Sequence, residues 1–534
     1  MFRELCRILG FYLFGFSGIL VIPTLLATYY EAYVDPSLHL QTHSTHAFLM
    51  TLGITLLLAG ILYGWGRSAN RHVYKREGIA AVVLIWILTP ALCALPFYLS
   101  GILENYHQAY FEAVSGLTTT GATVLEAKQY DTEGHEIPIE VTVPGVINTL
   151  YKYKGTVTPI RDQDGHILFE GVEAVGKALL FWRSFIQWMG GVGIVVLFVA
   201  ILPLLGAGGK LLYQAEVPGP VKEGLTPRIT ETAGQLWKIY CILSFTEIVL
   251  LMLTNAELPF FDAITITFST LSTGGFSIKN ASIGSYQNLS TEWIVMIFMV
   301  AGGINFSLYY YALKGKIFRL NDSEFLLYLA SVILGSLFIS WLLWNPLAFS
   351  DAFRHGTFQW ISALTSTGFV TSYYNVWPYT AQILLLFAMY IGGMSGSTAG
   401  GIKTVRHYML FKALQSKVES IFRPHLVRHL TIGGKELDFS GITTVLCFFV
   451  IVIVISTLGA YFYVLDGIDP ETSMGLTACM VNNTGLAFRV ADASHSCAFL
   501  SDFSLLLSNA LMILGRLEFF AVLALLVPSF WKQQ

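Results

Sequence analysis

Four short stretches of this 534-residue chain combine a hydroxyl or amide side chain with threonine and then glycine. Residues of these types can bind a monovalent cation through the backbone. Glycine lets the chain turn its carbonyl oxygens toward a common axis, and carbonyl oxygens can replace the hydration shell of the ion. The stretches are Leu117-Thr118-Thr119-Thr120-Gly121, Leu271-Ser272-Thr273-Gly274, Leu364-Thr365-Ser366-Thr367-Gly368 and Val481-Asn482-Asn483-Thr484-Gly485.

A second motif follows each stretch, within the next apolar block. A single Thr-Gly is an ordinary turn and a single Gly-Gly is a helix-packing device, but four registered copies of both indicate an internal repeat. We expect each repeat to be a span, a re-entrant stretch that ends in Thr-Gly, and a second span. The second motifs are Gly190-Gly191, Gly302-Gly303, Gly392-Gly393 and Gly515-Arg516.

The elements that must position these loops are predicted from composition. Of all residues, 54% are apolar and 12% are charged, against about 25% charged in an ordinary soluble domain. The apolar residues form blocks of about 20, the length that a membrane-spanning helix needs. Ten spans are expected, near 8–30, 46–66, 78–100, 174–203, 235–256, 291–313, 324–345, 378–400, 441–465 and 503–530.

Charge fixes the expected orientation and the limits of the repeats. Lysines and arginines that flank the spans, such as Arg3, Arg67, Lys314 and Arg406, predict cytoplasmic loops and two cytoplasmic termini. The net charge of −3 indicates no nucleic acid partner, and the six scattered cysteines indicate no disulfide framework or zinc site. The expected units are 1–77 (two leading helices), 78–205 (repeat 1, with an exposed outer insertion at 122–172), 206–320 (repeat 2), 321–438 (repeat 3) and 439–534 (repeat 4).

The short segments before the loops are expected to be helices. Asp262, Asp351 and Asp469 stand near three of their starts, and acidic residues favour a helix N-terminus. Each helix would then point its C-terminal end, with roughly half a negative charge, at the centre of the membrane. Four such ends would stabilise a dehydrated cation without a carboxylate in its path. Irregular backbone at this depth also requires burial in protein or a water-filled cavity.

The third repeat differs from the others in its second span, where residues 392–401 contain five glycines. Each glycine inside a helix costs roughly 1 kcal/mol relative to alanine, so the span is expected to break below the loops and obstruct the pathway. The predicted gating residues are Gly392, Gly393, Ser395, Gly396, Ser397, Thr398, Gly400, Gly401, Lys403 and Arg516.

Arg516 occupies the position of a glycine in the fourth repeat, and a charged residue within a span is a functional candidate. Two interpretations are open. Arg516 could pair with Glu518 or with carbonyls of the broken helix as a structural element. Alternatively, it faces the cavity, binds the gating segment and acts as an electrostatic barrier to cations, which is the hypothesis we favour.

These motifs resemble those of the Trk/Ktr/HKT superfamily of cation transporters, closest to the bacterial TrkH type, over essentially the whole chain. The resemblance implies an all-α membrane protein of four concatenated helix–pore-loop–helix units preceded by two extra helices. It also implies potassium uptake across the cytoplasmic membrane and no enzymatic activity. The potassium-binding positions that it implies are Thr119, Thr120, Gly121, Ser272, Thr273, Gly274, Ser366, Thr367, Gly368, Asn483, Thr484 and Gly485.

The same resemblance implies partners and a gate. It places the gating loop at 392–401, and it implies a homodimer with one pore per subunit. Since this chain shows no nucleotide-binding domain, a TrkA-like cytosolic subunit that binds nucleotides is the implied regulator. The basic loops around 403–435 and 207–234 are candidate docking surfaces for it, or else their charges only enforce topology.

Two other functions remain open on the sequence. A proton- or sodium-coupled carrier would use a carboxylate within a span, for which Glu247 and Glu518 are candidates. An intramembrane serine protease would use Ser395, which stands in a Gly-x-Ser-Gly motif, together with a histidine base on a neighbouring span. The histidines after Ser395 fall in loops or at a helix end, which disfavours the protease.

Overall fold

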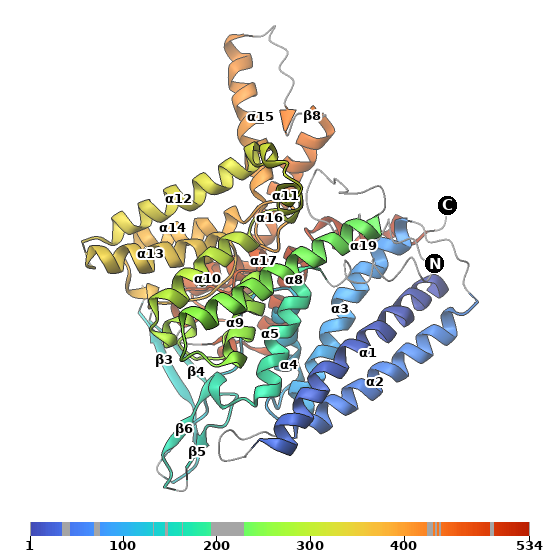
Figure 1. Ribbon diagram of the computed structural model, residues 1–534, viewed down its shortest axis with the longest axis vertical. Helices are drawn as coiled ribbons and strands as arrows, with labels where there is room; N and C mark the ends of the chain where they lie inside the picture. The colour runs from blue at the N-terminus through green and yellow to red at the C-terminus, as the bar shows by residue number, and fades with distance from the viewer. Residues whose placement is uncertain are drawn as a thin grey trace.

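The computed structural model describes residues 2–34, 43–68, 75–131, 133–144, 148–162, 164–193, 229–345, 347–423, 431–432, 435–436, 439–491 and 496–532. Among these residues, helices dominate (Figure 1). Six helices are single, long and apolar enough to cross a membrane. They are α1 (Phe2–Tyr33), α2 (Ser44–Gly66), α3 (Lys75–Leu99), α8 (Ile229–Thr254), α12 (Ser323–Leu343) and α16 (Phe439–Leu465).

Two further spans are bent pairs of helices, which brings the number in the described part of the chain to at most eight. One pair is α10 (Leu289–Gly302) with α11 (Phe306–Leu313), bent by 94°. The other is α18 (Asp502–Arg516) with α19 (Phe520–Leu526), bent by 117°. Both breaks follow the second motif of a repeat.

Ten spans were expected, and the remaining two are short helices in the structure. The first, α5 (Lys177–Gly191), has 15 residues, and 194–228 lie outside the described residues. The second, α14 (Tyr379–Ile391), has 13 residues and ends where the glycine-rich segment begins. The helix after that segment is α15 (Thr404–Phe422), which projects from the end of the molecule opposite to the strands between residues 129 and 169 (Figure 1).

Four short helices lie between the longer ones. Each packs against the long helix that precedes it: α3 with α4, α8 with α9, α12 with α13 and α16 with α17. Their N-termini are capped or acidic, since Asn105 and Asp469 accept a hydrogen bond from the first turn, and Asp262 and Asp351 stand within it. The short helices are α4 (Tyr106–Leu117), α9 (Phe260–Leu271), α13 (Phe349–Leu364) and α17 (Pro470–Asn482).

The segment between α4 and α5 forms three antiparallel hairpins, with Val141 opposite Tyr151 in the longest. A fourth hairpin joins β7 (Thr431–Ile432) to β8 (Lys435–Glu436). The first three pair β1 (Gln129–Tyr130) with β2 (Glu136–Ile137), β3 (Ile139–Val143) with β4 (Thr149–Tyr153), and β5 (Ile160–Arg161) with β6 (Ile167–Phe169).

The sequence suggested that the insertion at 122–172 is exposed. In the structure it is partly buried, because alternate residues of its strands face the helices. Ile139, Val143 and Val157 are buried. The Tyr151 hydroxyl donates a hydrogen bond to Asp469 at the start of α17, at 2.6 Å. Burial raises the pKa of Tyr151, so its hydroxyl stays protonated as the donor. The insertion is thereby tied to the fourth repeat.

The two leading helices α1 and α2 lie side by side at one edge of the molecule (Figure 1). Glu31 near the end of α1 accepts hydrogen bonds from Ser44 and from the backbone of Thr45 at the start of α2. Tyr12 of α1 also bonds Thr89 of α3 at 2.6 Å. This hairpin therefore packs against the first repeat without contributing to the four loops.

Candidate functional site

The four short helices end in loops with one shared backbone conformation. In each loop one non-glycine residue is left-handed, with φ between 52° and 56°, and the glycine two positions later is left-handed as well. The non-glycine residues are Thr119, Thr273, Ser366 and Asn483. We call residues 118–121, 272–275, 365–368 and 482–485 the first to fourth loops, and the glycines Gly121, Gly275, Gly368 and Gly485 the glycine ring.

A common hydrogen bond closes each of these turns. The amide of the residue before each ring glycine donates to the carbonyl five positions earlier, at 2.8 to 3.1 Å. A bond of this span beside a left-handed residue is the usual stop for a helix. The donors and acceptors are Thr120 to Ser115, Gly274 to Ser269, Thr367 to Ser362 and Thr484 to Cys479.

The second loop has a different register from the one taken from the sequence. Gly274 was matched with Gly121, but Gly275 carries the left-handed φ of 77° and Gly274 does not. Gly274 therefore takes the place that threonine holds in the other three loops. The sequence alone does not reveal this register, because either glycine of the Gly-Gly dipeptide can adopt a left-handed conformation.

The ring glycines bring the loops together around one centre. A Cβ built on any of them would strike the carbonyl oxygen of the residue that precedes the ring glycine of the next loop. The contacts run in order around a closed circle: Gly121 to Gly274, Gly275 to Thr367, Gly368 to Thr484, and Gly485 to Thr120. Any side chain here would be strained and would collide with backbone, so only glycine fits.

Polar side chains behind the ring hold its threonines. Thr118 and Thr120 share a hydroxyl–hydroxyl bond of 2.8 Å, and Thr365 and Thr367 share another of 2.8 Å. In the fourth loop, Asn483 donates to the Thr120 hydroxyl at 2.9 Å and so joins the fourth loop to the first. These groups are 0–1% exposed, so the loops are fixed by bonds within the protein.

A buried ion pair braces the first two loops. Arg183 on α5 binds Glu112 on α4 at 2.7 Å, and the two side chains are 1% and 0% exposed. Arg183 also donates to the Ser277 carbonyl at 2.9 Å, just after the second loop. Glu112 accepts a bond from the Val124 amide, just after the first loop. The pair links the two loops across 71 residues of sequence.

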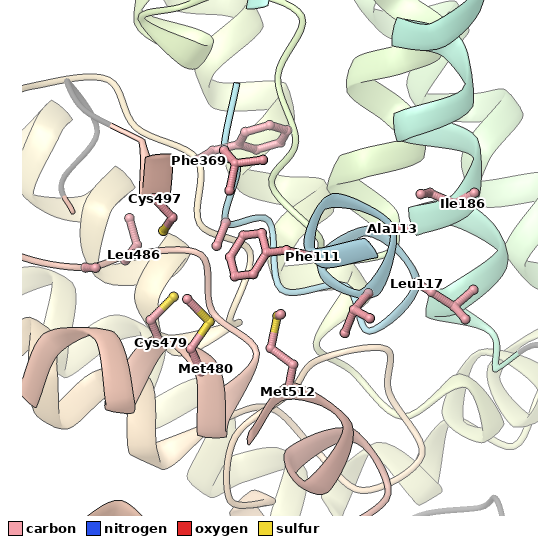
Figure 2. Close-up of a cluster of buried hydrophobic side chains, with 14 of the residues drawn as sticks. Phe111, Ala113, Leu117, Ile186, Phe369, Cys479, Met480, Leu486, Cys497 and Met512 are labelled. Carbon is pink, nitrogen blue, oxygen red and sulfur yellow. The ribbon is translucent and has the colours of Figure 1, made fainter. Parts of the chain in front are cut away.

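Apolar side chains fill the space around the short helices. Figure 2 shows Leu117 of α4 and Ile186 of α5 in this cluster. Met512 of α18 lies in the same cluster, near Met480 of α17 and Phe111 of α4 (Figure 2). This packing sets where each helix ends, and the loops follow from it.

A cleft that is open to solvent lies over the glycine ring and is lined by all four of its glycines. Its walls include residues that follow the ring glycines in sequence, such as Thr123, Ser277, Val370 and Leu486. The cleft therefore leads from the side of the strands to the ring. Four helix C-termini, each with a partial negative charge, converge beneath it.

The glycine-rich segment 392–401 crosses the opposite side of the ring. Thr398 donates to the Leu271 carbonyl at the end of α9, at 2.8 Å. The Gly400 amide donates to the Ser366 hydroxyl, and the Gly401 amide to the Asn482 carbonyl. The segment thus contacts three of the four loops or helix ends from the side away from the cleft.

Arg516 ties this segment to the first repeat. Its guanidinium donates to the Thr398 carbonyl at 3.1 Å, to the Thr119 hydroxyl at 3.2 Å and to the Gly190 carbonyl at 2.5 Å. Glu518 forms an ion pair with Arg406 of α15. The bond from Arg516 to a carbonyl of the broken segment is common to both interpretations of this residue.

The other predicted gating residues lie on the same segment or at its ends. Lys403 donates to the Ala399 carbonyl, and Glu324 of α12 accepts the Ser395 amide at 2.6 Å. His407, the described histidine nearest in sequence to Ser395, instead contacts the Tyr390 carbonyl. Glu247 of α8 is fully buried and lies next to Thr270 of α9, two residues before the second loop.

Four residues that matter to the site were not expected from the sequence. Gly275 was hidden by its neighbouring glycine. Glu112 and Arg183 bear charges within apolar segments, and that signal could have indicated a buried pair. Gln187 stands one helical turn after Arg183 on α5, on the same face.

Comparisons with known proteins agree with this architecture. Residues 156–533 match the family model TrkH, described as a cation transport protein. The Trk system potassium uptake protein TrkH of Escherichia coli K12 is 32% identical over 540 residues, covering 100% of both chains. The protein TrkG of the same Trk system in that strain is 31% identical over 541 residues, covering 99% of each chain.

A solved structure agrees as well. The crystal structure of the potassium transporter TrkH from Vibrio parahaemolyticus superposes with a TM-score of 0.80 and 29% sequence identity, covering 100% of both chains. The resemblance inferred from the motifs is thereby confirmed over the full length. This chain belongs to the TrkH family of cation transport proteins.

Proposed function

We propose that this chain takes up potassium across the cytoplasmic membrane of a bacterium through one central pore, with the glycine ring as its selectivity filter. The observation that carries the proposal is the closed circle of four glycines against four carbonyl oxygens. The full-length relatives named as potassium uptake proteins support the same ion. The family is one of transporters, not of enzymes.

In this function the cation enters by the cleft and loses water at the ring. The carbonyl oxygens before the ring glycines replace part of its hydration shell, and the four helix ends stabilise its charge. None of the four loops contains a carboxylate. The ring position is the one position that is glycine in all four loops. We therefore expect fewer ion sites than in potassium channels and weaker discrimination against sodium.

The segment 392–401 is the proposed gate. It lies directly below the ring, and its bonds to Ser366, Leu271 and Arg516 hold it there. Arg516 adds a positive charge to the path of the cation. Opening requires the segment to leave the ring and to exchange these bonds for others.

Regulation and assembly are proposed to follow the family. All four loops belong to one chain, so each copy of a homodimer has its own pore. Helix α15, which carries Lys412 and Lys417, projects from the end opposite to strands β3 to β6 (Figure 1). This end and both termini are proposed to be cytoplasmic, and α15 to be part of the docking surface for a TrkA-like nucleotide-binding subunit. The other candidate loop, 207–234, lies largely outside the described residues.

The test compares potassium and sodium flux in liposomes that hold the purified protein, for the wild type and Gly121→Ser. Gly134→Ser is the matched control, because Gly134 has a φ of 84° against 85° for Gly121 but has open space around it. Both variants strain the backbone equally, and only one alters the ring. We expect the flux ratio of potassium to sodium to fall roughly tenfold in Gly121→Ser, the equivalent of about 1.4 kcal/mol, and to be unchanged in Gly134→Ser.

Two results would contradict the proposal. Equal selectivity in Gly121→Ser and the wild type would show that the ring does not choose the ion. Flux that depends on an imposed proton or sodium gradient, and is indifferent to Gly121→Ser, would favour a coupled carrier.

A further inference from the structure

The second loop lacks the side chain that braces the others. Three loops have threonine before the ring glycine, and in the first and third its hydroxyl bonds the threonine two positions earlier. In the second loop that position is Gly274, so Ser272 has no such partner there. The second loop nevertheless adopts the same backbone conformation as the rest.

Gln187 of α5 supplies the missing bonds. Its amide nitrogen donates to the Gly274 carbonyl at 2.6 Å, and its amide oxygen accepts the Phe276 amide at 3.1 Å. The side chain is 0% exposed. One planar amide therefore holds the backbone on both sides of the ring glycine Gly275.

Gln187 also occupies the space of the missing threonine. A Cβ built on Gly274 would lie 2.5 Å from Cδ of Gln187 and 2.8 Å from its two amide heteroatoms. These distances are shorter than van der Waals contact. A side chain at 274 would therefore displace the Gln187 amide from its present position.

The corresponding position of the other repeats holds methionine. Gln187 stands three residues before Gly190, the first glycine of the second motif. The residues three before Gly302, Gly392 and Gly515 are Met299, Met389 and Met512, all buried. Methionine has no hydrogen-bond donor, so it cannot hold a carbonyl. The one glutamine at this position, in the first repeat, contacts the one loop that lacks the threonine, which belongs to the second repeat.

We infer that Gln187 is a specificity-determining positioning residue, which replaces the threonine of the second loop and fixes the Gly274 carbonyl at the edge of the pore. The inference rests on the proposed filter function of the glycine ring. A carbonyl that already accepts a bond from Gln187 is a weaker ligand for a cation than its three counterparts. One of the four carbonyl ligands in the ring, that of the second loop, therefore differs from the other three.

The test exchanges the pairs between repeats. Gln187→Met removes the brace, and Gln187→Met with Gly274→Thr rebuilds the arrangement of the first and third loops, with the Ser272 hydroxyl as the partner. We expect Gln187→Met to lower the potassium-to-sodium flux ratio roughly tenfold, because both buried hydrogen bonds of the Gln187 amide are lost. The double variant is expected to recover most of that ratio. Gly274→Thr alone is expected to reduce flux, because threonine collides with Gln187.

Gln382→Met is the matched control. Gln382 is also buried, and its amide donates to the Asn375 and Trp377 carbonyls at 2.8 Å, but it lies on α14 away from the ring. A purely structural role of Gln187 predicts equal effects of the two variants on thermal stability and on selectivity. The inference predicts a change of selectivity for Gln187→Met only.

The outcomes separate this inference from the filter itself. If Gly121→Ser loses selectivity and Gln187→Met does not, Gln187 is not a specificity residue, although the filter stands. If neither variant changes selectivity, the filter proposal fails first. If Gln187→Met does not fold, Gln187→Leu gives the same comparison. A double variant no more selective than Gln187→Met overturns the exchange of glutamine for threonine.

Discussion

At the scale of single residues, the glycine ring depends on buried polar side chains that are hydrogen-bonded within the protein. Arg183 is an example, since its guanidinium binds the Glu112 carboxylate, the Ser277 carbonyl and the Thr123 hydroxyl. Glu112 in turn accepts bonds from Thr123 and Val124. The net contribution of such a pair to stability is small, because both charges lose water on burial. Its effect lies in tying two distant loops to one geometry.

Removal of one partner of the Arg183–Glu112 pair is predicted to lower the stability of the protein far more than removal of both charges. Arg183→Leu leaves the Glu112 charge buried and unpaired, which costs about 3–5 kcal/mol, whereas Arg183→Leu with Glu112→Gln is expected to recover much of this. Thermal unfolding in detergent measures the difference. Lys152→Leu is the control, because its pair with Glu140 is exposed and contributes less than about 1 kcal/mol. Equal melting temperatures of the single and double variants would contradict the prediction.

At the scale of elements, the second helices of the repeats have diverged around a common pattern. In α5, α10 and α18 the first glycine of the second motif packs against the carbonyl that ends the short helix of the same repeat. In the third repeat the helix stops at Ile391, and Gly392 instead contacts Gly400 and Ile402. The freed segment then fills the space below the ring. A local break in one helix thus produces the proposed gate.

The bonds of Arg516 to this segment are predicted to favour the closed state. Arg516→Ala removes the bonds to Thr398, Thr119 and Gly190 and also a positive charge. We expect potassium flux to rise by roughly tenfold or more, since one such bond to a charged group contributes about 1.5–3 kcal/mol. Liposome flux measures this. Arg489→Ala, which breaks a peripheral pair with Glu471, is the control. A flux equal to wild type in Arg516→Ala would refute the role.

At the scale of the whole molecule, all four repeats belong to one chain, so each can carry different residues. The first and second loops share the Arg183–Glu112 pair, the third repeat supplies the broken segment, and the fourth supplies Arg516. A tetramer of identical subunits would repeat every feature four times. The hairpins β1 to β6 and the projecting α15 lie at opposite ends of the molecule (Figure 1), so the proposed ion entry and the proposed docking surface are separated in space.

Charge reversal on α15 is predicted to disrupt regulation without affecting the pore. Lys412→Glu with Lys417→Glu is expected to weaken binding of the TrkA-like subunit at least about tenfold, since complementary charges steer such contacts. Flux of the purified protein alone should stay as in the wild type. Lys152→Glu, at the opposite end, is the control in a binding assay with the purified regulatory subunit. Unchanged binding would show that the lysines on α15 serve only topology.

The sequence by itself determined the features that depend on local chemistry. Apolar length predicts spanning helices, and a polar residue, threonine and glycine at a helix end predict a left-handed stop. Five glycines in ten residues predict a break in the third repeat. The family also followed from these motifs, because they recur along the chain in the same order.

The tertiary structure alone decided how distant segments meet. Either glycine of Gly274-Gly275 could be left-handed, and the choice follows from where α9 ends and from Gln187, which fills the place of a side chain at 274. The Arg183–Glu112 pair spans 71 residues. The insertion is partly buried because the fourth repeat, over 300 residues later, covers its strands. No local pattern specifies these contacts, since they form only when the repeats close into a ring.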